Sequence, residues 1–354
     1  MQVTVCRPEE IGPAEIRAWQ AMQRDTPSLG SPFLSAEFAR TAGRFRPAAR
    51  VAVLADGAQT VGFFPFERGR LGAGAPLCGL PGTFVQGVVH APGADWDARE
   101  LLRGCGLSAW QFDHLLASQH PFARYQAAMA PSAVMDLSDG YPAFHERLST
   151  KAPRFVKDLA RNMRRLERDV GPLRLETGFT DPAPLQMMMK WKGEQYRRNG
   201  WVFDYGRPWA SGLLEQLQAA RGEQFAGLTG VTYAGDEPVA GQFGLRSGDL
   251  MDGWFIAYDQ RFARYSPGLI HILQMAEAIA GAGVHYVEMG DGAASFKEKL
   301  RSHDNVVSKG MVTSGSMLAA AHRAGGAVRR RVGDAVYQHP RLYRATLRAR
   351  SAFR

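Results

Sequence analysis

The hydrophobic pattern is clearest between residues 250 and 292, where it predicts a strand, a helix and a second strand. Residues 250–258 are bulky, aromatic and, apart from Asp252, uncharged, which is typical of a strand buried on both faces. From Ser266 onward, apolar side chains recur every three or four positions, which indicates a helix of about four turns. Residues 284–289 are strand-like again. We therefore expect a βαβ crossover.

The start of this helix predicts an anion site. Ser266 is expected to cap the helix, and Pro267 stands at the first helical position, where no N–H is needed. Arg261 and Arg264 lie in the loop just upstream. Because a helix start combines unpaired N–H groups with a positive dipole, a diphosphate is the expected ligand. The alternative is that the two arginines are solvated loop residues.

A hairpin pattern occurs twice, in residues 226–233 and 238–246 and again in residues 50–55 and 60–67. The earlier pair flanks Asp56-Gly57, a common hairpin turn, and Pro65 indicates an edge strand or a strand end. The later pair leads into the strand at 250–258 as its antiparallel neighbours. This repetition favours an α/β protein built from two tandem halves of one fold.

Helices and strands are also predicted in the rest of the chain. Helical patterns cover residues 14–24, a segment starting at Ser31, and residues 97–104, 150–170, 183–198 and 210–220, and strand patterns cover 109–116 and 126–137. Residues 69–94 are broken by glycine and proline, so they form either a phosphate-binding loop or a long surface loop. The helix at 150–170 has seven cations around one apolar face, which indicates either an anion-binding surface or a solvated face.

Composition excludes several classes of protein. With 354 residues, 45% of them apolar and 22% charged, the chain is long enough for two domains with real cores. No apolar run reaches membrane-spanning length and none resembles a signal peptide, so we expect a soluble, cytoplasmic protein. The three cysteines lack metal or disulfide spacing and are expected to be buried thiols, and the histidines lack paired spacing, so no metal is expected.

The net charge of +9 belongs mostly to the C-terminal end. Residues 317–354 hold nine arginines against Asp334, so the remainder of the chain is nearly neutral. Nucleic-acid binding is therefore not expected of the body. The tail either lies on an anionic membrane or nucleic acid, with the inner face of the membrane or a polysaccharide synthase as the expected contact, or is a solvated helical appendage.

Three motifs resemble a known family: Tyr258 to Gly268 (YDQRFARYSPG), Glu288 to Gly292 (EMGDG), and the pair Phe296-Lys297. They are similar to the core of the GNAT-type acyltransferases related to the cellulose-biosynthesis protein CelD, which are relatives of the FemABX peptidyltransferases. The similarity is strongest over residues 225–300 and extends weakly to most of the chain. In place of the first glycine of the usual GNAT phosphate loop, this chain has Pro267.

The resemblance implies an α/β fold of two tandem GNAT-like domains with mixed sheets flanked by helices. A degenerate N-terminal domain would cover residues 1–148 and an acyltransferase domain residues 149–316, followed by the basic tail 317–354. It implies acetyl-CoA or another acyl-CoA as co-substrate. Its phosphates and pantetheine would be bound by Tyr258, Arg261, Arg264, Ser266, Gly268 and Leu269.

Acyl transfer also needs a proton acceptor and a group that protonates the leaving thiolate. Asp291 and Glu288 follow the second strand of the crossover, at the edge where ligands gather in such sheets, and are the expected bases. Tyr265, with Tyr258 as an alternative, is the expected acid, although each of these residues could instead have only a structural role. The acceptor is expected near Trp191, Tyr196, Asp252, Trp254 and Lys297.

The predicted reaction is therefore acyl transfer, N-acetylation in the simplest case, to a sugar, amino sugar or related precursor of exopolysaccharide, cellulose or cell envelope. Two alternatives stay open. One is a non-enzymatic accessory protein of an exopolysaccharide machine, which the proline in the loop favours. The other is aminoacyl transfer of the FemABX kind, which the basic helix favours.

Overall fold

The computed structural model describes residues 1–292 and 294–315, so the basic segment 317–354 lies outside the described residues. In the N-terminal half the elements are β1 (Gln2–Cys6), α1 (Pro13–Asp25), α2 (Ala36–Phe45), β2 (Ala49–Asp56), β3 (Gln59–Arg68), β4 (Ala73–Pro76), β5 (Val89–His90), α3 (Ala98–Gly104), β6 (Ala109–Leu116) and β7 (Gln126–Asp136). The C-terminal half contains α4 (Tyr141–Lys151), α5 (Pro153–Asp169), β8 (Leu173–Thr177), α6 (Ala183–Asn199), α7 (Pro208–Gln218), β9 (Phe225–Ala234), β10 (Glu237–Ser247), β11 (Leu250–Tyr258), α8 (Pro267–Gly281), β12 (Tyr286–Glu288), α9 (Ser295–Leu300) and β13 (His303–Thr313).

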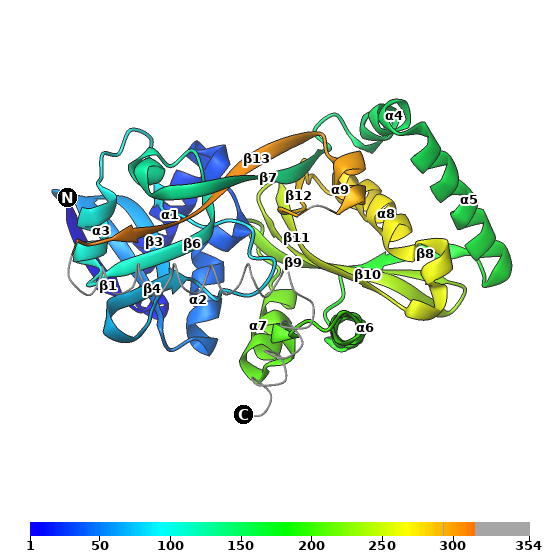
Figure 1. Cartoon of the computed structure of the whole chain (residues 1–354), viewed down its shortest axis with the longest axis horizontal. Coiled ribbons are helices and arrows are strands. Elements are labelled where there is room, and N and C mark those ends of the chain that lie inside the picture. Colours follow the sequence, from blue (N-terminus) through cyan, green and yellow to red (C-terminus); the bar gives the residue numbers. More distant parts are fainter. Residues whose placement is uncertain (293, 316–354) are drawn as a thin grey trace.

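One mixed sheet runs through both halves (Figure 1). Its strand order is β1-β2-β3-β4-β6-β13-β7-β12-β11-β10-β9-β8, and β5 pairs separately with β3. The strand that comes last in the described chain, β13, lies between β6 and β7 and is antiparallel to both. Because β7 also pairs with β12, the two halves share an unbroken ladder of hydrogen bonds at their junction.

The two halves repeat one arrangement. In the C-terminal half, β11 and β12 are parallel and are joined by α8, which confirms the βαβ crossover. In the N-terminal half, β4 and β6 are parallel and are separated in the chain by α3. Each crossover follows an antiparallel hairpin, β9–β10 or β2–β3. The predicted α/β fold of two tandem halves, with a mixed sheet flanked by helices, is confirmed.

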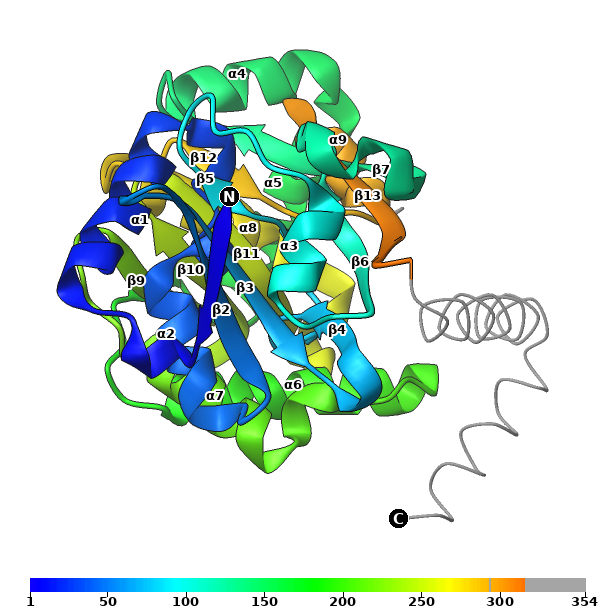
Figure 2. The same cartoon turned by 90° about the vertical axis from the view of Figure 1, so that its left-hand side faces the viewer.

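Helices cover both faces of the sheet. In the C-terminal half, α8 and α5 pack with β11 and β12 in one core, whereas α6 and α7 belong to a core on the other face (Figure 1). Figure 2 looks at the N-terminal half, where α1 and α2 lie on one face of the strands and α3 on the other.

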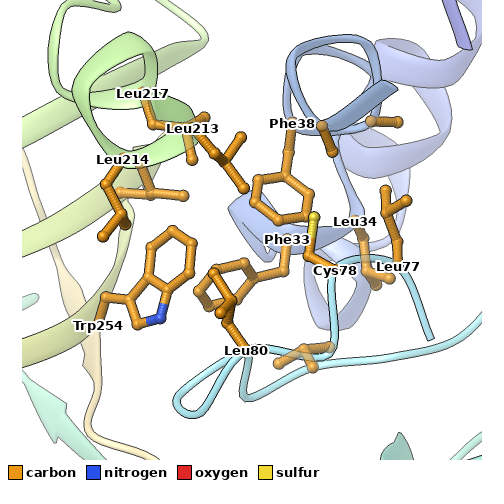
Figure 3. Close-up of a cluster of buried hydrophobic side chains, with 14 of the residues drawn as sticks. Phe33, Leu34, Phe38, Leu77, Cys78, Leu80, Leu213, Leu214, Leu217 and Trp254 are labelled. Atoms are coloured by element: carbon orange, nitrogen blue, oxygen red, sulfur yellow. The ribbon is translucent and has the colours of Figure 1, made fainter. Parts of the chain in front are cut away.

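The core that contains α6 and α7 extends from one half into the other (Figure 3). Phe33, Phe38 and Leu80 of the N-terminal half face Leu214 and Trp254 of the C-terminal half. The Trp254 ring packs edge-on against Phe33 at 5.0 Å and against Phe38 at 6.2 Å between centroids. Since these side chains are almost fully buried, the halves form one packed body.

The structure corrects several boundaries. The helix expected at 150–170 is α5, which begins at Pro153, because proline can begin a helix but cannot continue one; residues 150 and 151 end the preceding helix α4, which was not predicted. The segment 69–94 is not a surface loop: it forms β4 and β5 and buries Leu80 and Val88. Pro65 lies inside β3, opposite Val51. Strand β3 pairs with β5 at Gly62 and Phe63 and with β4 from Phe66 to Arg68, so neither strand requires an N–H at Pro65.

Cys78 and Cys105 are buried as expected, whereas Cys6 is only half-buried, and all three are free thiols. Within the part of the chain that the structure describes, no helix has the length and hydropathy needed to cross a bilayer.

Candidate active site between two diverging strands

The site follows from a mismatch in strand length. Strand β12 pairs with β11 only over Leu250–Asp252, but β11 continues to Tyr258. From Gly253 onward, the β12-facing edge of β11 therefore has no strand beside it among the described residues. A cavity of about 590 Å³ opens in this wedge.

The cavity passes through the sheet from one face to the other. The α8 side contributes mainly apolar groups: Met251, Leu269, Ile272, Met275, Ala276, Ile279 and Val287. The α6 side contributes aromatic and polar groups: Lys192, Gln195, Tyr196, Tyr205, Trp254 and Phe255. Pro81, Gly82 and Phe84 of the N-terminal half close one end. Such a cavity could hold two reactants that approach from opposite faces.

The exposed edge of β11 presents backbone polar groups to the cavity. The Lys192 Nζ donates a hydrogen bond to the carbonyl oxygen of Ile256 at 3.0 Å. In a strand, the N–H and C=O of one residue point to the same side, so the Ile256 N–H also points into the wedge. This N–H is a donor that a bound carbonyl group could use.

At the start of α8, the structure leaves one amide for a ligand. Ser266 is left-handed, with φ 57° and ψ 49°, and its side chain makes no capping bond, so the expected side-chain cap is wrong. The Ser266 carbonyl instead accepts from the N–H groups of Leu269 and Ile270 at 3.0 and 3.3 Å. Since Pro267 has no N–H, Gly268 holds the free first-turn amide, and it lines the cavity beside Tyr258.

The two loop arginines do not line the cavity. The Arg261 guanidinium, 63% exposed, pairs with Asp259 and Glu237 at 2.8 Å. The Arg264 guanidinium is 67% exposed and lies over the ring of Tyr265. Both arginines are thus held on the outer surface of the loop.

Tyr265 is also placed away from the cavity. Its side chain is buried, and its hydroxyl donates to Asp169 Oδ2 on α5 at 2.8 Å. Trp191 likewise lies in the core on the α6 side and does not line the cavity.

Asp252 and Glu288 form a buried pair of carboxyl groups on adjacent strands. Ser31 donates a hydrogen bond to Asp252 at 2.6 Å. Glu288 accepts hydrogen bonds from Asn305 at 2.8 Å and from Ser132 at 2.5 Å. Burial raises the pKa of Asp252 well above its ordinary value, and the nearby Glu288 raises it further. Burial likewise raises the pKa of Glu288, although its hydrogen bonds oppose this. Neither carboxyl group lines the cavity.

Asp291, one of the two expected bases, is paired with cations in the structure. His114 of the N-terminal half lies 3.1 Å from its Oδ1 and Lys309 3.7 Å from its Oδ2. Burial alone would lower the pKa of His114, but hydrogen bonds with Asp113 and Asp291 raise it to about 9. The same hydrogen bond lowers the pKa of Asp291. At neutral pH these two groups are an ion pair that joins the halves.

This ion pair predicts a pH dependence of stability. The folded-state pKa of His114 is raised, so its contribution is complete below the ordinary value of 6.5 and disappears as the pH rises through about 9. The contribution is on the order of 3 kcal/mol. We expect His114→Gln to lose less stability than the wild type between pH 6 and pH 10, as measured by urea unfolding. His120→Gln, at an exposed position, should behave as the wild type. Equal pH dependence in wild type and His114→Gln would contradict the pairing of His114 with Asp113 and Asp291.

Two lysines line the cavity, and sequence analysis found only one of them. The Lys297 Nζ donates to the carbonyl oxygens of Asp291 and Gly290 at 2.7 and 3.3 Å. Lys192 lies on α6, one turn before Tyr196. The i to i+4 spacing of Lys192 and Tyr196 was the signal that both face one side of the helix.

The predicted site residues thus divide into two groups. The cavity is lined by Tyr196, Trp254, Tyr258, Ser266, Gly268, Leu269 and Lys297. The residues outside its lining are Trp191, Asp252, Arg261, Arg264, Tyr265, Glu288 and Asp291. Lining residues that sequence analysis did not identify include Phe84, Lys192, Tyr205 and Gln242.

Comparisons with known proteins agree with this architecture. No curated protein matches the chain. Three solved structures have a similar fold. FemX has 11% identity and a TM-score of 0.54, with 88% of this chain and 96% of FemX covered. The C-terminal DUF2156 domain of a proposed lysylphosphatidylglycerol synthetase from Agrobacterium fabrum has 13% identity and a TM-score of 0.51, with 88% and 97% covered. A conserved protein of unknown function from Bacteroides thetaiotaomicron has 11% identity and a TM-score of 0.50, with 88% and 99% covered.

At these identities the three structures are similar to this chain in fold only. A family model described as an acetyltransferase (GNAT) domain matches residues 153–298, which run from the first residue of α5 into α9 and include the strands that form the cavity. Residues 153–298 are therefore similar to a GNAT acetyltransferase domain, in a chain built from two tandem α/β halves that share one mixed sheet.

Proposed function

We propose that this protein is an acyltransferase that uses acetyl-CoA or another acyl-CoA and that its reaction takes place in the wedge between β11 and β12. The observation that carries the proposal is that β12 ends at Glu288, opposite Asp252, while β11 continues to Tyr258. It opens a cavity to both faces of the sheet, with a helix N-terminus beside it. One face can then admit the donor and the other the acceptor.

The donor is proposed to lie on the α8 side. The Gly268 N–H and the positive end of the α8 dipole would bind its pyrophosphate, next to Ser266 and Leu269. The narrow pantetheine arm would follow the exposed edge of β11. There the Ile256 N–H can donate to the thioester carbonyl, and that bond strengthens as negative charge develops on the oxygen.

The acceptor is proposed to enter from the α6 side and to be a sugar, amino sugar or related envelope or exopolysaccharide precursor. Rings of Tyr196, Tyr205 and Trp254 surround this end of the cavity and offer flat apolar faces to a sugar ring. The CelD-like motifs of the sequence support this class of acceptor. Tyr205 and Trp254 both donate to the carbonyl of Pro81, which fixes their orientation.

Proton transfer is proposed to depend on the cationic cavity. Its described lining residues include no carboxylate, while Lys192 and Lys297 are both present. Nearby positive charge lowers the pKa of an acceptor ammonium, so the amine would bind in its neutral, nucleophilic form. As the amine attacks the thioester, the C–S bond would break and the proton lost from the nitrogen would pass to the leaving thiolate, which gives CoA and the amide. Because His114 holds the Asp291 carboxylate, we propose that Asp291 positions Lys297 through its backbone carbonyl.

Two observations favour the alternatives. Aminoacyl transfer of the FemABX kind is favoured by the fold shared with FemX. It is also favoured by three exposed cations on α5, for which the described part of the chain provides no carboxylate partner: Arg154, Lys157 and Arg164. The single free amide at the start of α8, with both arginines turned outward, favours the accessory protein.

The test is isothermal titration of the full chain with acetyl-CoA, longer acyl-CoAs and CoA. We expect dissociation constants in the micromolar to millimolar range that is ordinary for enzyme substrates. Release of free thiol on adding an amino sugar would then show transfer. If no acyl-CoA binds, the donor assignment is wrong and the two alternatives take its place.

A further inference from the structure

Lys192 and Lys297 are the only charged side chains among the described residues that line the cavity. Neither ammonium is paired with a carboxylate there. Lys192 donates to the Ile256 carbonyl, and Lys297 donates to the carbonyls of Gly290 and Asp291. Both cations are therefore fixed in place by neutral oxygens.

Holding two cations in this cavity is unfavourable without a partner. Burial lowers the pKa of Lys192 to about 8, and the positive charge of Lys297 contributes to that shift. Burial also lowers the pKa of Lys297, against the opposing effect of Asp291 and Glu288. The Lys297 ammonium also lies over an aromatic ring, 5.8 Å from the ring centre of Phe84. A bound anion would neutralise the charge of Lys192 and add to the partial compensation that Asp291 and Glu288 give Lys297.

We propose that the acyl acceptor carries a carboxylate or a phosphate and that this anionic group binds between Lys192 and Lys297. The identification of the bound molecule as the acyl acceptor rests on the proposed function, whereas the anion site itself rests on the two lysines. Charge-assisted hydrogen bonds from two ammonium groups are the chemistry that recognises such a group.

The donor's own phosphates are not what these lysines bind. Lys192 reaches the cavity from α6, which packs on the face of the sheet opposite α8 and its Gly268 amide. Lys297 faces Phe84, a residue of the N-terminal half. Lys297 thus lies beside Phe84 of the N-terminal half, and Lys192 lies on the face of the sheet opposite the start of α8, where the donor phosphates are proposed to bind.

An anionic acceptor also fits the chemistry of the amine. The lysines disfavour a protonated amine beside them, which helps to produce the nucleophile, but they would equally repel a simple cationic amine before it bound. An acceptor with its own negative group binds through that group and places its neutral amine next to the thioester.

The test compares binding of three amino sugars to the full chain by isothermal titration: glucosamine, glucosamine 6-phosphate and muramic acid, which carries a carboxylate. We expect at least one of the two anionic sugars to bind about tenfold or more tightly than glucosamine, as two charge-assisted bonds would give. The arm that binds identifies a phosphate or a carboxylate as the anion. Lys192→Met should remove this preference. Lys190→Met, an exposed lysine on the same helix, should retain it.

Folding is checked by circular dichroism, and Lys297→Met provides a second variant with the same expected loss. Equal affinity for all three sugars in the wild type would overturn the proposal, as would equal losses in Lys190→Met and Lys192→Met. A fall in CoA affinity in Lys192→Met would also overturn it, because the lysine would then serve the donor. If CoA does not bind to the wild type but the lysine-dependent preference remains, the anion site stands and the acyl-CoA assignment fails.

Discussion

Replacing Gly268 with glutamate is expected to abolish CoA binding while the protein stays folded. The Gly268 amide is the free first-turn N–H of α8, and a side chain at this position would enter the cavity. A Cβ there would lie 3.5 Å from Tyr258 and 3.6 Å from Ile256, which are ordinary contact distances. The fold can therefore accept the residue. Its carboxylate, however, would occupy the place of the pyrophosphate and repel it.

We expect a loss of CoA affinity of about hundredfold or more, equivalent to about 2.7 kcal/mol, in isothermal titration. Gly268→Gln has the same shape without the charge and should lose less. Gly268→Ala should bind CoA with little change. Unchanged titration by folded Gly268→Glu would show that the donor phosphates bind elsewhere.

The fold could be predicted where one segment carries its own complete pattern. Residues 250–289 contain both strands of the crossover and the helix between them, and the periodicity of each is uninterrupted. The hairpins are similar, because Asp56-Gly57 and Gly235-Asp236 supply turns between adjacent apolar runs. In these cases the partners of each strand are its neighbours in sequence.

Strand β13 could not be predicted, because its burial is set by strands far away in sequence. Residues His303 to Val306 pair only with β7 and are exposed. From Val307 the strand lies between β6 and β7, and its residues become mostly buried. Because the surroundings change along the strand, its apolar and polar residues do not alternate with a period of two. The strand that joins the two halves thus lacks the local pattern by which a strand is predicted.

The candidate site was predicted in part for the same reason. Gly268 and Lys297 belong to the contiguous motifs and were found, whereas Lys192 is contributed by a helix about sixty residues before the edge of β11 that it contacts. The loop arginines were expected at the donor phosphates but do not line the cavity, because sequence shows a cation but not its partner. Arg261 pairs with Asp259, two residues away, and with Glu237 on β10. These local ion pairs turn it away from the cavity.

Gly290→Ala is expected to destabilise the protein strongly and to disturb the closed end of the cavity. Gly290 follows β12 with φ 78°, where an L-residue is strained. A Cβ there would lie 2.3 Å from the ring of Phe84, which is buried and packs against Phe33. Strain and overpacking together give an expected loss of about 2–4 kcal/mol in urea unfolding.

Two further variants separate the two causes. Gly292 also has a positive φ, 112°, but the nearest atom to its added Cβ is the Lys297 Nζ at 3.9 Å. Gly292→Ala should therefore show only the backbone strain, about 1 kcal/mol. Phe84→Ala removes the ring with which the added Cβ of Gly290→Ala would clash. The loss of stability in the double variant should therefore be smaller than the sum of the two single losses, by about 1 kcal/mol or more. Strict additivity would mean that Phe84 does not pack against this turn, and the residues placed at this end of the cavity would then have to be reassigned.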